Sequence, residues 1–335
     1  MTDDDRFLRA AGWGDAVRVQ LAGDASSRSY ARLVRRSGTA ILMSLPEGSE
    51  DIARRFLRMT DWLRAHGYSA PAIIAQDVTL RWLRIEDLGD NLIARQLASI
   101  PDRADELYAL AVDFLIDLHR HAPPDFAASL DGAALADLVD VMPRWYLAGT
   151  GRHGDAGADR IGREIARLYD ALGGEETVLS LRDFHAENLI WLPDRTGVAR
   201  LGVLDHQDAL AAHPAYDLVS LLQDARRDVP AALETRMIRR FARETAQDQD
   251  RFAAIYALLG AQRALRIIGV FARLCLADGK AQYLQRIPRE FGYLNRNLRH
   301  PALRSLKELS DAVLPAPGEA ALESLRMKCG TYRTA

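Results

Sequence analysis

The sequence is poor in lysine. Lys280, Lys307 and Lys328 are the only lysines among 44 basic residues, so the first 279 residues contain none. This excludes any N-terminal mechanism that depends on a lysine, including a phosphate-binding loop ending in Gly-Lys-Ser/Thr and a Schiff-base lysine. We attribute the bias to a genome that favours arginine codons, and the chemical consequence holds whatever its origin.

Cysteine and long apolar runs are also scarce. Cys275 and Cys329 are the only cysteines, so there is no disulfide framework and we expect a reducing compartment. The best apolar run, Ile267–Ala277, is interrupted by Arg273 and is short of the roughly 18 apolar residues of a membrane helix. The N-terminus is acidic and lacks an apolar signal core. We therefore expect a soluble, cytoplasmic protein that binds no membrane.

The remaining composition is that of a globular protein. The chain has 335 residues, 48% hydrophobic and 27% charged, which is enough for roughly two structural lobes. The formal net charge of -2 favours no nucleic-acid partner. The charge is uneven, because residues 251–335 carry +8 and residues 1–250 carry -10. Such a basic segment favours an anionic or neutral substrate over a polycation.

Hydrophobic periodicity predicts an α+β fold with a small β-rich lobe and a larger, mostly helical lobe. We expect domains at 1–88, for the nucleotide, and 89–335, for the catalytic loop and the acceptor. In the first part the patterns predict these strands and this helix: Val17–Leu21, Tyr30–Val34, Ala40–Leu45, Ile52–His66 (helix), Ala72–Ala75 and Trp82–Ile85. The first three strands are predicted to form an antiparallel meander, with a turn at Arg36-Ser37-Gly38.

Beyond residue 90 the pattern is helical with one β insertion. The predicted helices are Ala104–His119, Ala158–Leu172, Pro214–Arg226, Ala231–Thr245, Asp250–Leu276 and Gln282–Asn295. The predicted strands are Val178–Leu181, Leu189–Leu192 and Val198–Leu204. The last two would form a hairpin.

The β insertion carries the residues best suited to chemistry. Asp183 ends an apolar strand, Asn188 follows five residues later, and Asp205 ends another strand seventeen residues after that. A hairpin between them could bring the strand ends together. Phosphoryl transfer needs a carboxylate that takes the acceptor proton and oxygen ligands that hold Mg²⁺, and this set supplies both.

These motifs resemble the aminoglycoside phosphotransferase superfamily, small-molecule kinases with a two-lobed, protein-kinase-like fold. The matching residues are Asp183, Asn188 and Asp205, joined by the segment His213-Pro214-Ala215-Tyr216-Asp217-Leu218. The resemblance implies an ATP-dependent enzyme in which Asp183 is the catalytic base and Asn188 and Asp205 bind Mg²⁺. It also implies that Asp217 steadies the catalytic loop.

A subgroup of that superfamily is more similar still. The kinases of cell-wall recycling that phosphorylate the anomeric hydroxyl of N-acetylmuramate and N-acetylglucosamine share several features with this chain. These are the loop Gly23–Tyr30, the strand residues Ile41-Leu42-Met43, the hinge Ile85–Gly89, the segment Leu204–Asp208 and the helix residues Ala261-Gln262-Arg263. Gly23, Ser26 and Ser27 would then offer backbone and hydroxyl groups to phosphate, although a simple hairpin turn is the alternative. Glu86 and Leu88 would bind adenine through their backbone.

The sequence departs from the family pattern at two places. Leu181 stands where a scaffold histidine is common, and the lysine usual on the third strand would fall near Met43, where there is none. We expect Arg28, Arg32 or both to contact the phosphates instead, because a guanidinium can fork onto phosphate oxygens. The alternative is that both are surface arginines.

Further polar residues are candidates for the acceptor site. His185, Glu187 and His206 surround the catalytic base but lack the spacing of a zinc site, so they either line the acceptor site or complete loop hydrogen bonds. Asp208 is an acceptor contact or a turn residue. Arg263 lies in an apolar helix and needs an anionic partner, either a structural carboxylate or the substrate.

The sequence therefore predicts an ATP- and Mg²⁺-dependent kinase of a small amino sugar. The first alternative is a phosphotransferase for aminoglycosides or another small hydroxyl compound, such as an amino alcohol. An alternative of another class is a nucleotide-binding pseudokinase that acts as a partner-binding module. The oligomeric state is not predicted.

Overall fold

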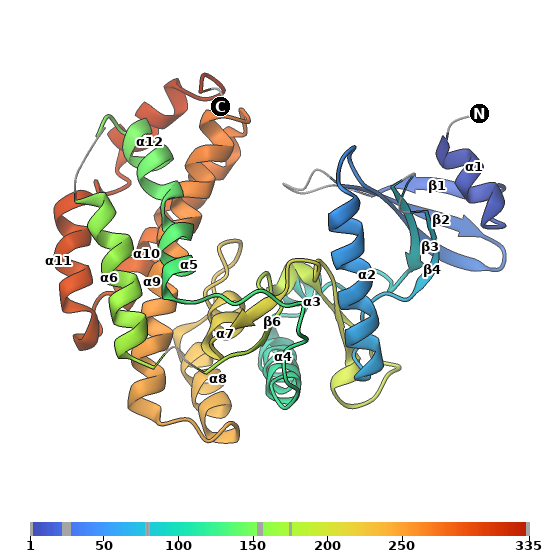
Figure 1. Ribbon diagram of the computed structural model, residues 1–335, viewed down its shortest axis with the longest axis horizontal. Helices are drawn as coiled ribbons and strands as arrows, with labels where there is room; N and C mark the ends of the chain where they lie inside the picture. The colour runs from blue at the N-terminus through green and yellow to red at the C-terminus, as the bar shows by residue number, and fades with distance from the viewer. Residues whose placement is uncertain are drawn as a thin grey trace. The chain divides into compact units, whose positions relative to one another are not determined.

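The computed structural model describes residues 3–21, 28–77, 79, 81–152, 157–173 and 176–332 (Figure 1). The chain forms two compact units. Unit 1 comprises Met1–Asp117 and Leu181–Ala209, and unit 2 comprises Leu118–Ser180 and Leu210–Ala335. The segment with the predicted catalytic residues is thus part of the same unit as the N-terminal sheet. The functional division predicted at residue 88 stays a prediction.

Unit 1 contains a five-stranded antiparallel sheet. The strands are β1 (Val17–Gln20), β2 (Ser29–Arg35), β3 (Gly38–Ser44), β4 (Ile73–Asp77) and β5 (Trp82–Glu86), in the order β1-β2-β3-β5-β4. Arg35 pairs with Gly38, whose φ of +136° suits glycine at this tight turn. The predicted meander of the first three strands is confirmed.

Both faces of this sheet are covered by helices of unit 1. The two helices are α1 (Asp3–Ala10) and α2 (Glu50–Ala65). Phe56 of α2 packs against Met43 and Leu83, and Leu8 of α1 packs in a separate cluster with Leu33. Burial of each such side chain stabilises the fold by about 1.5–3 kcal/mol. Because alternate residues of β3 and β5 point to the same face, their apolar side chains determine where α2 packs.

A short hairpin completes unit 1. The remaining elements are α3 (Ile93–Ser99), the 3₁₀ helix η1 (Pro101–Arg103), α4 (Ala104–Leu118, whose last residue falls in unit 2), η3 (Ala186–Asn188), β7 (Leu189–Trp191), η4 (Gly197–Arg200) and β8 (Leu201–Val203). The strand predicted over Val198–Leu204 is partly wrong, because its first residues form η4. Pro193 follows β7 by two residues and has no backbone N–H to donate to a partner strand. The paired part of the hairpin is therefore short, and so is β8.

Unit 2 is mostly helical. Its elements are α5 (Gly132–Val139), the π-helical segment η2 (Met142–Leu147), α6 (Ala158–Ala171), β6 (Val178–Ser180), β9 (Leu210–Ala212), α7 (Ala215–Leu222), α8 (Ala231–Glu244), α9 (Gln249–Leu276), η5 (Ala281–Arg286), α10 (Ile287–Asn297), η6 (Pro301–Leu303), α11 (Arg304–Val313) and α12 (Glu319–Met327). Strands β6 and β9 pair antiparallel. The helix predicted over Pro214–Arg226 ends early, at Leu222.

Helix α9 is the core of unit 2. It is long and apolar enough to cross a membrane, with a mean hydropathy of 1.4 in its most apolar window, but 83% of that window is buried inside the protein. Helices α5, α6, α7 and α10 all pack against it. We conclude that α9 is apolar because neighbouring helices surround it.

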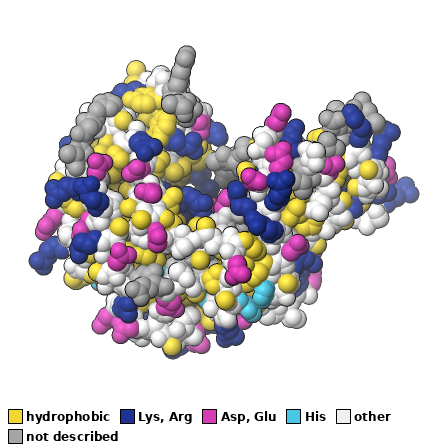
Figure 2. Space-filling view, viewed as in Figure 1, with side chains coloured by type: hydrophobic (Ala, Val, Ile, Leu, Met, Phe, Trp, Pro, Cys, Tyr) yellow, Lys and Arg dark blue, Asp and Glu magenta, His cyan; other side chains and the backbone are white. Residues whose placement is uncertain are grey.

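The uneven charge of the sequence is partly neutralised within unit 2. Arg289 and Arg296 of the basic C-terminal segment pair with Asp228 and Glu234, which lie in the acidic part of the chain. Over the face drawn in Figure 2, basic and acidic side chains are interspersed. The regional charge therefore carries less information about the substrate than its sequence value of +8 implies.

Gly269 gives a test of packing around α9. A Cβ at Gly269 would lie 2.5 Å from the backbone N of Met142, whereas one at Gly292 of α10 would meet nothing within 4 Å. We expect Gly269→Ala to lower the free energy of unfolding by about 1–3 kcal/mol through overpacking. The control Gly292→Ala should raise it by about 0.5–1 kcal/mol, because alanine favours helix. Urea unfolding measures both, and a stabilised Gly269→Ala protein would contradict the packing described.

Candidate active site

The β7–β8 hairpin brings the two predicted metal-binding residues to one end. Leu189 pairs with Val203 and Trp191 with Leu201. At the end of this ladder the N–H of Leu204 donates to the carbonyl of Asn188 at 2.9 Å. Asp205 is the next residue, so a backbone hydrogen bond fixes its distance from Asn188.

The loop that carries Asp183 is held by its own hydrogen bonds. The side-chain Nδ2 of Asn188 donates to the carbonyl of Asp183 at 2.9 Å. Phe184 is buried and stacks on Phe114 of α4, with ring centroids 5.6 Å apart. The side chain of Asp183 is partly exposed. The loop is therefore anchored through its apolar and amide neighbours, while the Asp183 carboxylate is accessible.

Two residues of this region have left-handed backbone conformations. Arg182 has a φ of +69° and Asp205 a φ of +59°. This region is unfavourable for residues other than glycine, and it is enriched at active sites, where surrounding structure imposes it. The fold therefore constrains the residue before Asp183 and Asp205 itself.

Asp217 contacts the strand that leads into the loop. Ser180, at the end of β6, donates through its hydroxyl to a carboxylate oxygen of Asp217 at 2.7 Å, and both side chains are buried. Ser180 precedes Asp183 by three residues. This contact is consistent with the stabilising role that the family resemblance implies for Asp217.

Arg28 forms an ion pair with Asp205. One guanidinium nitrogen contacts the Asp205 carboxylate, and another donates to Oε1 of Gln207 at 2.6 Å. The Arg28 side chain is 10% exposed and that of Asp205 is 33% exposed. Gln207 in turn donates to Asp205 at 3.0 Å. A positive charge thus already lies beside the carboxylate predicted to bind a metal.

Asp208 extends the same network. It accepts a hydrogen bond from Nε2 of Gln207 at 2.9 Å and lies 3.4 Å from a guanidinium nitrogen of Arg55 on α2. Neither Gln207 nor Arg55 is predicted as a site residue from the sequence. Gln207 lies within the motif Leu204–Asp208, but Arg55 reaches the site only through the packing of α2, for which the sequence contains no local signal.

His206 is buried in the core of unit 1. Its Nε2 lies 2.7 Å from the hydroxyl of Thr60, and its ring stacks on Phe56 with centroids 4.7 Å apart. The side chain has no exposed surface, and burial lowers its pKa to about 4. His206 therefore links the segment after Asp205 to helix α2.

Glu86 ends β5 and Leu88 follows it, whereas Arg32 lies in the middle of β2. Arg32 forms ion pairs with Asp87, at 2.7 Å, and Asp90, at 2.8 Å. The Glu86 carboxylate pairs with Arg195 at 2.7 Å, and the Glu86 N–H donates to the carbonyl of Ala72. Leu88 is buried. Arg32 thus has two carboxylate partners beside the predicted hinge.

The other predicted residues are distributed as follows. His185 is buried and Glu187 partly exposed, both in the Asp183 loop. Arg263 belongs to unit 2 and is 7% exposed. Gly23, Ser26 and Ser27 lie outside the described residues. Among the residues described, no group of three His, Cys, Asp or Glu side chains could hold a metal ion.

Known proteins are similar to this chain over most of its length. The sequence profile of the phosphotransferase enzyme family matches residues 18–255. The chain is 38% identical to an N-acetylmuramate/N-acetylglucosamine kinase of Caulobacter vibrioides, over 92% of this chain and 95% of the relative. It is 32% identical to a kinase of the same name from Pseudomonas aeruginosa, over 96% and 100%.

A solved structure shows the same fold. The aminoglycoside phosphotransferase of Streptomyces rimosus, in complex with ADP and streptomycin, superposes with a TM-score of 0.55 at 19% identity, over 77% of this chain and 98% of that one. The chain therefore has the kinase-like fold of these phosphotransferases. It belongs to the phosphotransferase enzyme family and is homologous to amino-sugar kinases.

His213 gives a test that depends on pH. Burial, with a smaller effect of Arg251, lowers its pKa to about 4, and its Nδ1 accepts a hydrogen bond from the N–H of Ala215. Unfolding restores a pKa near 6.5, so the unfolded chain binds an extra proton between about pH 6.5 and 4. We expect the contribution of His213 to the unfolding free energy to decrease as the pH falls through this range.

The measurement is urea unfolding of wild type and His213→Asn at pH 7, 6 and 5. The variant should show a shallower acid dependence, with a difference in slope of up to about 1.4 kcal/mol per pH unit. Equal slopes would show that His213 titrates alike in the folded and unfolded chain.

Proposed function

We propose that this phosphotransferase uses ATP and Mg²⁺ to phosphorylate the anomeric hydroxyl of N-acetylmuramate and N-acetylglucosamine in the cytoplasm. The observation that carries the proposal is the 38% identity, over 92% of the chain, to a kinase of these two sugars. The β7–β8 hairpin supports it, because it holds the Asp183 loop beside Asp205. The expectation of no nucleic-acid or membrane partner is part of the proposal.

Asp183 is the proposed catalytic base. Its partly exposed carboxylate would orient the acceptor hydroxyl and take its proton, as the hydroxyl oxygen bonds to the γ-phosphorus of ATP. The bond between that phosphorus and the β–γ bridging oxygen breaks, and ADP leaves. We propose three further residues as acceptor contacts. Two of them, His185 and Glu187, lie on the Asp183 loop, and the third, Asp208, belongs to the hydrogen-bond network of Asp205.

Asn188 and Asp205 are the proposed Mg²⁺ ligands. The donor set fits, because Mg²⁺ takes a few hard oxygen ligands and retains water at its other positions. Nδ2 of Asn188 donates a hydrogen bond to the Asp183 carbonyl. The amide oxygen of Asn188 therefore points away from that carbonyl. When bound, Mg²⁺ would neutralise phosphate charge. We propose His206, through Thr60 and Phe56, as a positioning residue for Asp205 and no longer as an acceptor contact.

Arg28 is the proposed substitute for the missing lysine. Its guanidinium already lies beside Asp205, so it would need to move little to contact phosphate oxygens. Arg32, although also predicted to bind phosphate, has Asp87 and Asp90 as partners. Glu86 and Leu88 remain the proposed adenine contacts, but the Glu86 N–H is bonded to Ala72, so adenine would use other backbone groups. The loop with Gly23, Ser26 and Ser27 is proposed for the phosphates.

A phosphate-transfer screen tests the activity and the role of Asp183. The acceptors are N-acetylmuramate, N-acetylglucosamine, kanamycin and choline, and NMR of the product locates the new phosphate. We expect a product phosphorylated at the anomeric oxygen. Asp183→Asn should lower kcat at least about a hundredfold, because it removes the base. Nucleotide binding without turnover of any acceptor would favour a pseudokinase, and a near-normal rate for Asp183→Asn would exclude it as base.

Single arginine variants test the replacement of lysine. We expect Arg28→Ala to raise KM for ATP at least about tenfold, the loss of roughly one charge-assisted contact. Arg32→Ala should raise KM for ATP less, because the Arg32 guanidinium is already paired with two carboxylates beside the hinge. The readout that does not depend on turnover is the Kd for ADP, measured calorimetrically with Mg²⁺ and with EDTA. Unchanged affinity in Arg28→Ala would exclude Arg28 from the phosphate site.

A further inference from the structure

Two polar layers are buried where α9, α10 and the end of α7 meet in unit 2. At the first layer α9 comes very close to its neighbours, because a Cβ on Gly260 would lie 2.4 Å from Asn297 and 2.8 Å from Gln223. The second layer lies one to two helical turns away. It consists of Arg263, three residues after Gly260; Asp224, the residue after Gln223; and Glu290, two turns before Asn297 on α10.

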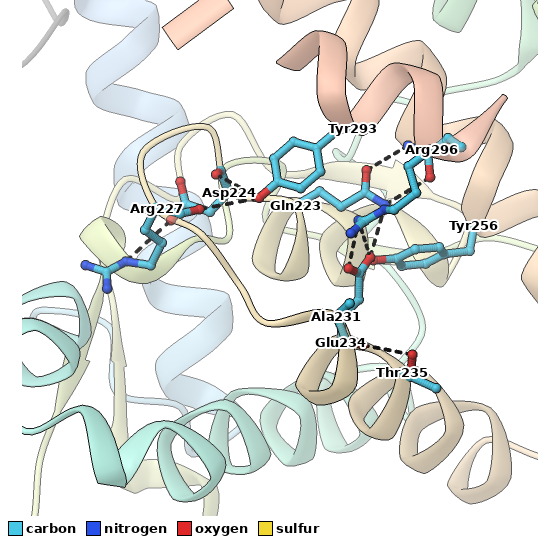
Figure 3. Close-up of polar contacts among 10 residues, drawn as sticks. Gln223, Asp224, Arg227, Ala231, Glu234, Thr235, Tyr256, Tyr293 and Arg296 are labelled. Carbon is cyan, nitrogen blue, oxygen red and sulfur yellow. Dashed lines mark hydrogen bonds and ion pairs between the residues drawn. The ribbon is translucent and has the colours of Figure 1, made fainter. Parts of the chain in front are cut away.

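The first layer is saturated with hydrogen bonds (Figure 3). Gln223 and Asn297 exchange a pair of amide hydrogen bonds, at 3.1 and 2.8 Å. Glu234 accepts from the Tyr256 hydroxyl at 2.8 Å, from Gln223 at 3.2 Å and from Arg296 at 2.8 Å. Its polar groups find their partners within the protein, as in a network that serves to hold helices together.

The second layer is not saturated. Oδ1 of Asp224 accepts from the N–H of Arg226 at 2.8 Å. Oδ2 of Asp224 and Oε1 of Glu290 are buried and have no hydrogen-bond partner in the described part of the chain. The two residues are 2% and 1% exposed. Arg227 forms an ion pair with Oδ2 at 4.0 Å, a distance too long for a hydrogen bond.

An unsatisfied buried acceptor is costly, and more than nine in ten buried polar groups in folded proteins have a partner. Two such oxygens in neighbouring residues therefore require an explanation. The adjacent saturated layer shows that this helix interface can satisfy buried polar groups when they serve only to hold it together. We infer that Asp224 and Glu290, with Arg263, form the subsite that binds the hydroxyl and acetamido groups of the amino sugar. This inference rests on the proposed function.

The charges of the layer suit a neutral sugar. Burial raises the pKa of Glu290 to about 8, an effect that Arg263 opposes and Asp224 reinforces. Burial therefore favours the neutral form of Glu290, and Asp224 has Arg227 as an ion-pair partner. Carboxyl oxygens accept from sugar hydroxyls, and a guanidinium donates to an acetamido carbonyl. An amino sugar without its acetyl group would bring an ammonium ion beside Arg263 and lose that carbonyl.

Asp224→Asn tests the subsite with little change in shape. Its Oδ1 can still accept from Arg226, but the unsatisfied oxygen becomes an N–H donor. We expect KM for N-acetylglucosamine to rise at least about tenfold, with KM for ATP within twofold of wild type. Calorimetric titration of the sugar alone should show the same loss of affinity. If Asp224→Asn fails to fold, Arg263→Gln, which removes the proposed donor to the acetamido group, should raise the same KM.

Tyr256→Phe is the matched control from the saturated layer. It removes one hydrogen bond to Glu234 and should lower Tm while both KM values stay within twofold. The wild-type enzyme should also prefer N-acetylglucosamine to glucosamine at least about tenfold.

The outcomes separate the two proposals. If the wild type phosphorylates amino sugars but Asp224→Asn and Arg263→Gln change only Tm, the layer is a structural site filled by buried water and the inference is wrong. Equal changes in both KM values would also overturn it. If the wild type turns over no amino sugar, the proposed function fails and the inference with it.

Discussion

The geometry of the candidate site depends on one short β-hairpin. Three paired residues in each of β7 and β8, together with the hydrogen bond from Leu204 to Asn188, bring together Asn188 and Asp205, which are seventeen residues apart in the chain. Because the ladder is backbone to backbone, it sets the separation of Asn188 and Asp205 independently of their side chains. Those side chains make further contacts within the site, Asn188 with the Asp183 carbonyl and Asp205 with Arg28. The left-handed φ of Asp205 is the strain that this arrangement imposes on the chain where it leaves the hairpin.

The lack of lysine in the first 279 residues defines the electrostatics of this site. A lysine would present a compact charge on a flexible stem, whereas Arg28 presents a planar fork that contacts Asp205 and Gln207 at once. In the structure described, this fork neutralises the carboxylate proposed to bind Mg²⁺. Nucleotide binding would therefore exchange one set of charge-assisted contacts for another, and its net energy is smaller than the sum of the new contacts.

The parts of the fold that follow from local periodicity could be predicted from the sequence. The meander of β1, β2 and β3, helix α2 and most long helices of unit 2 lie close to their predicted ranges. The short elements, such as α1 and α12, could not, because tertiary packing stabilises them. The same limit applies to the site. Asp183, Asn188 and Asp205 stood out as a motif, but the contact of His206 with Thr60, 146 residues away in sequence, needed the packed sheet and helix.

The basic C-terminal segment shows how regional charge changes meaning once the chain has folded. Its +8 charge favoured an anionic or neutral acceptor over a polycation, and within unit 2 Arg289 and Arg296 pair with Asp228 and Glu234 of the preceding segment. Basic side chains of α10 are therefore neutralised by carboxylates from the segments that precede α9. What distinguishes a place for a ligand there is the unsatisfied acceptor capacity of Asp224 and Glu290. Sequence composition does not encode that property, because it arises only when the helices have packed.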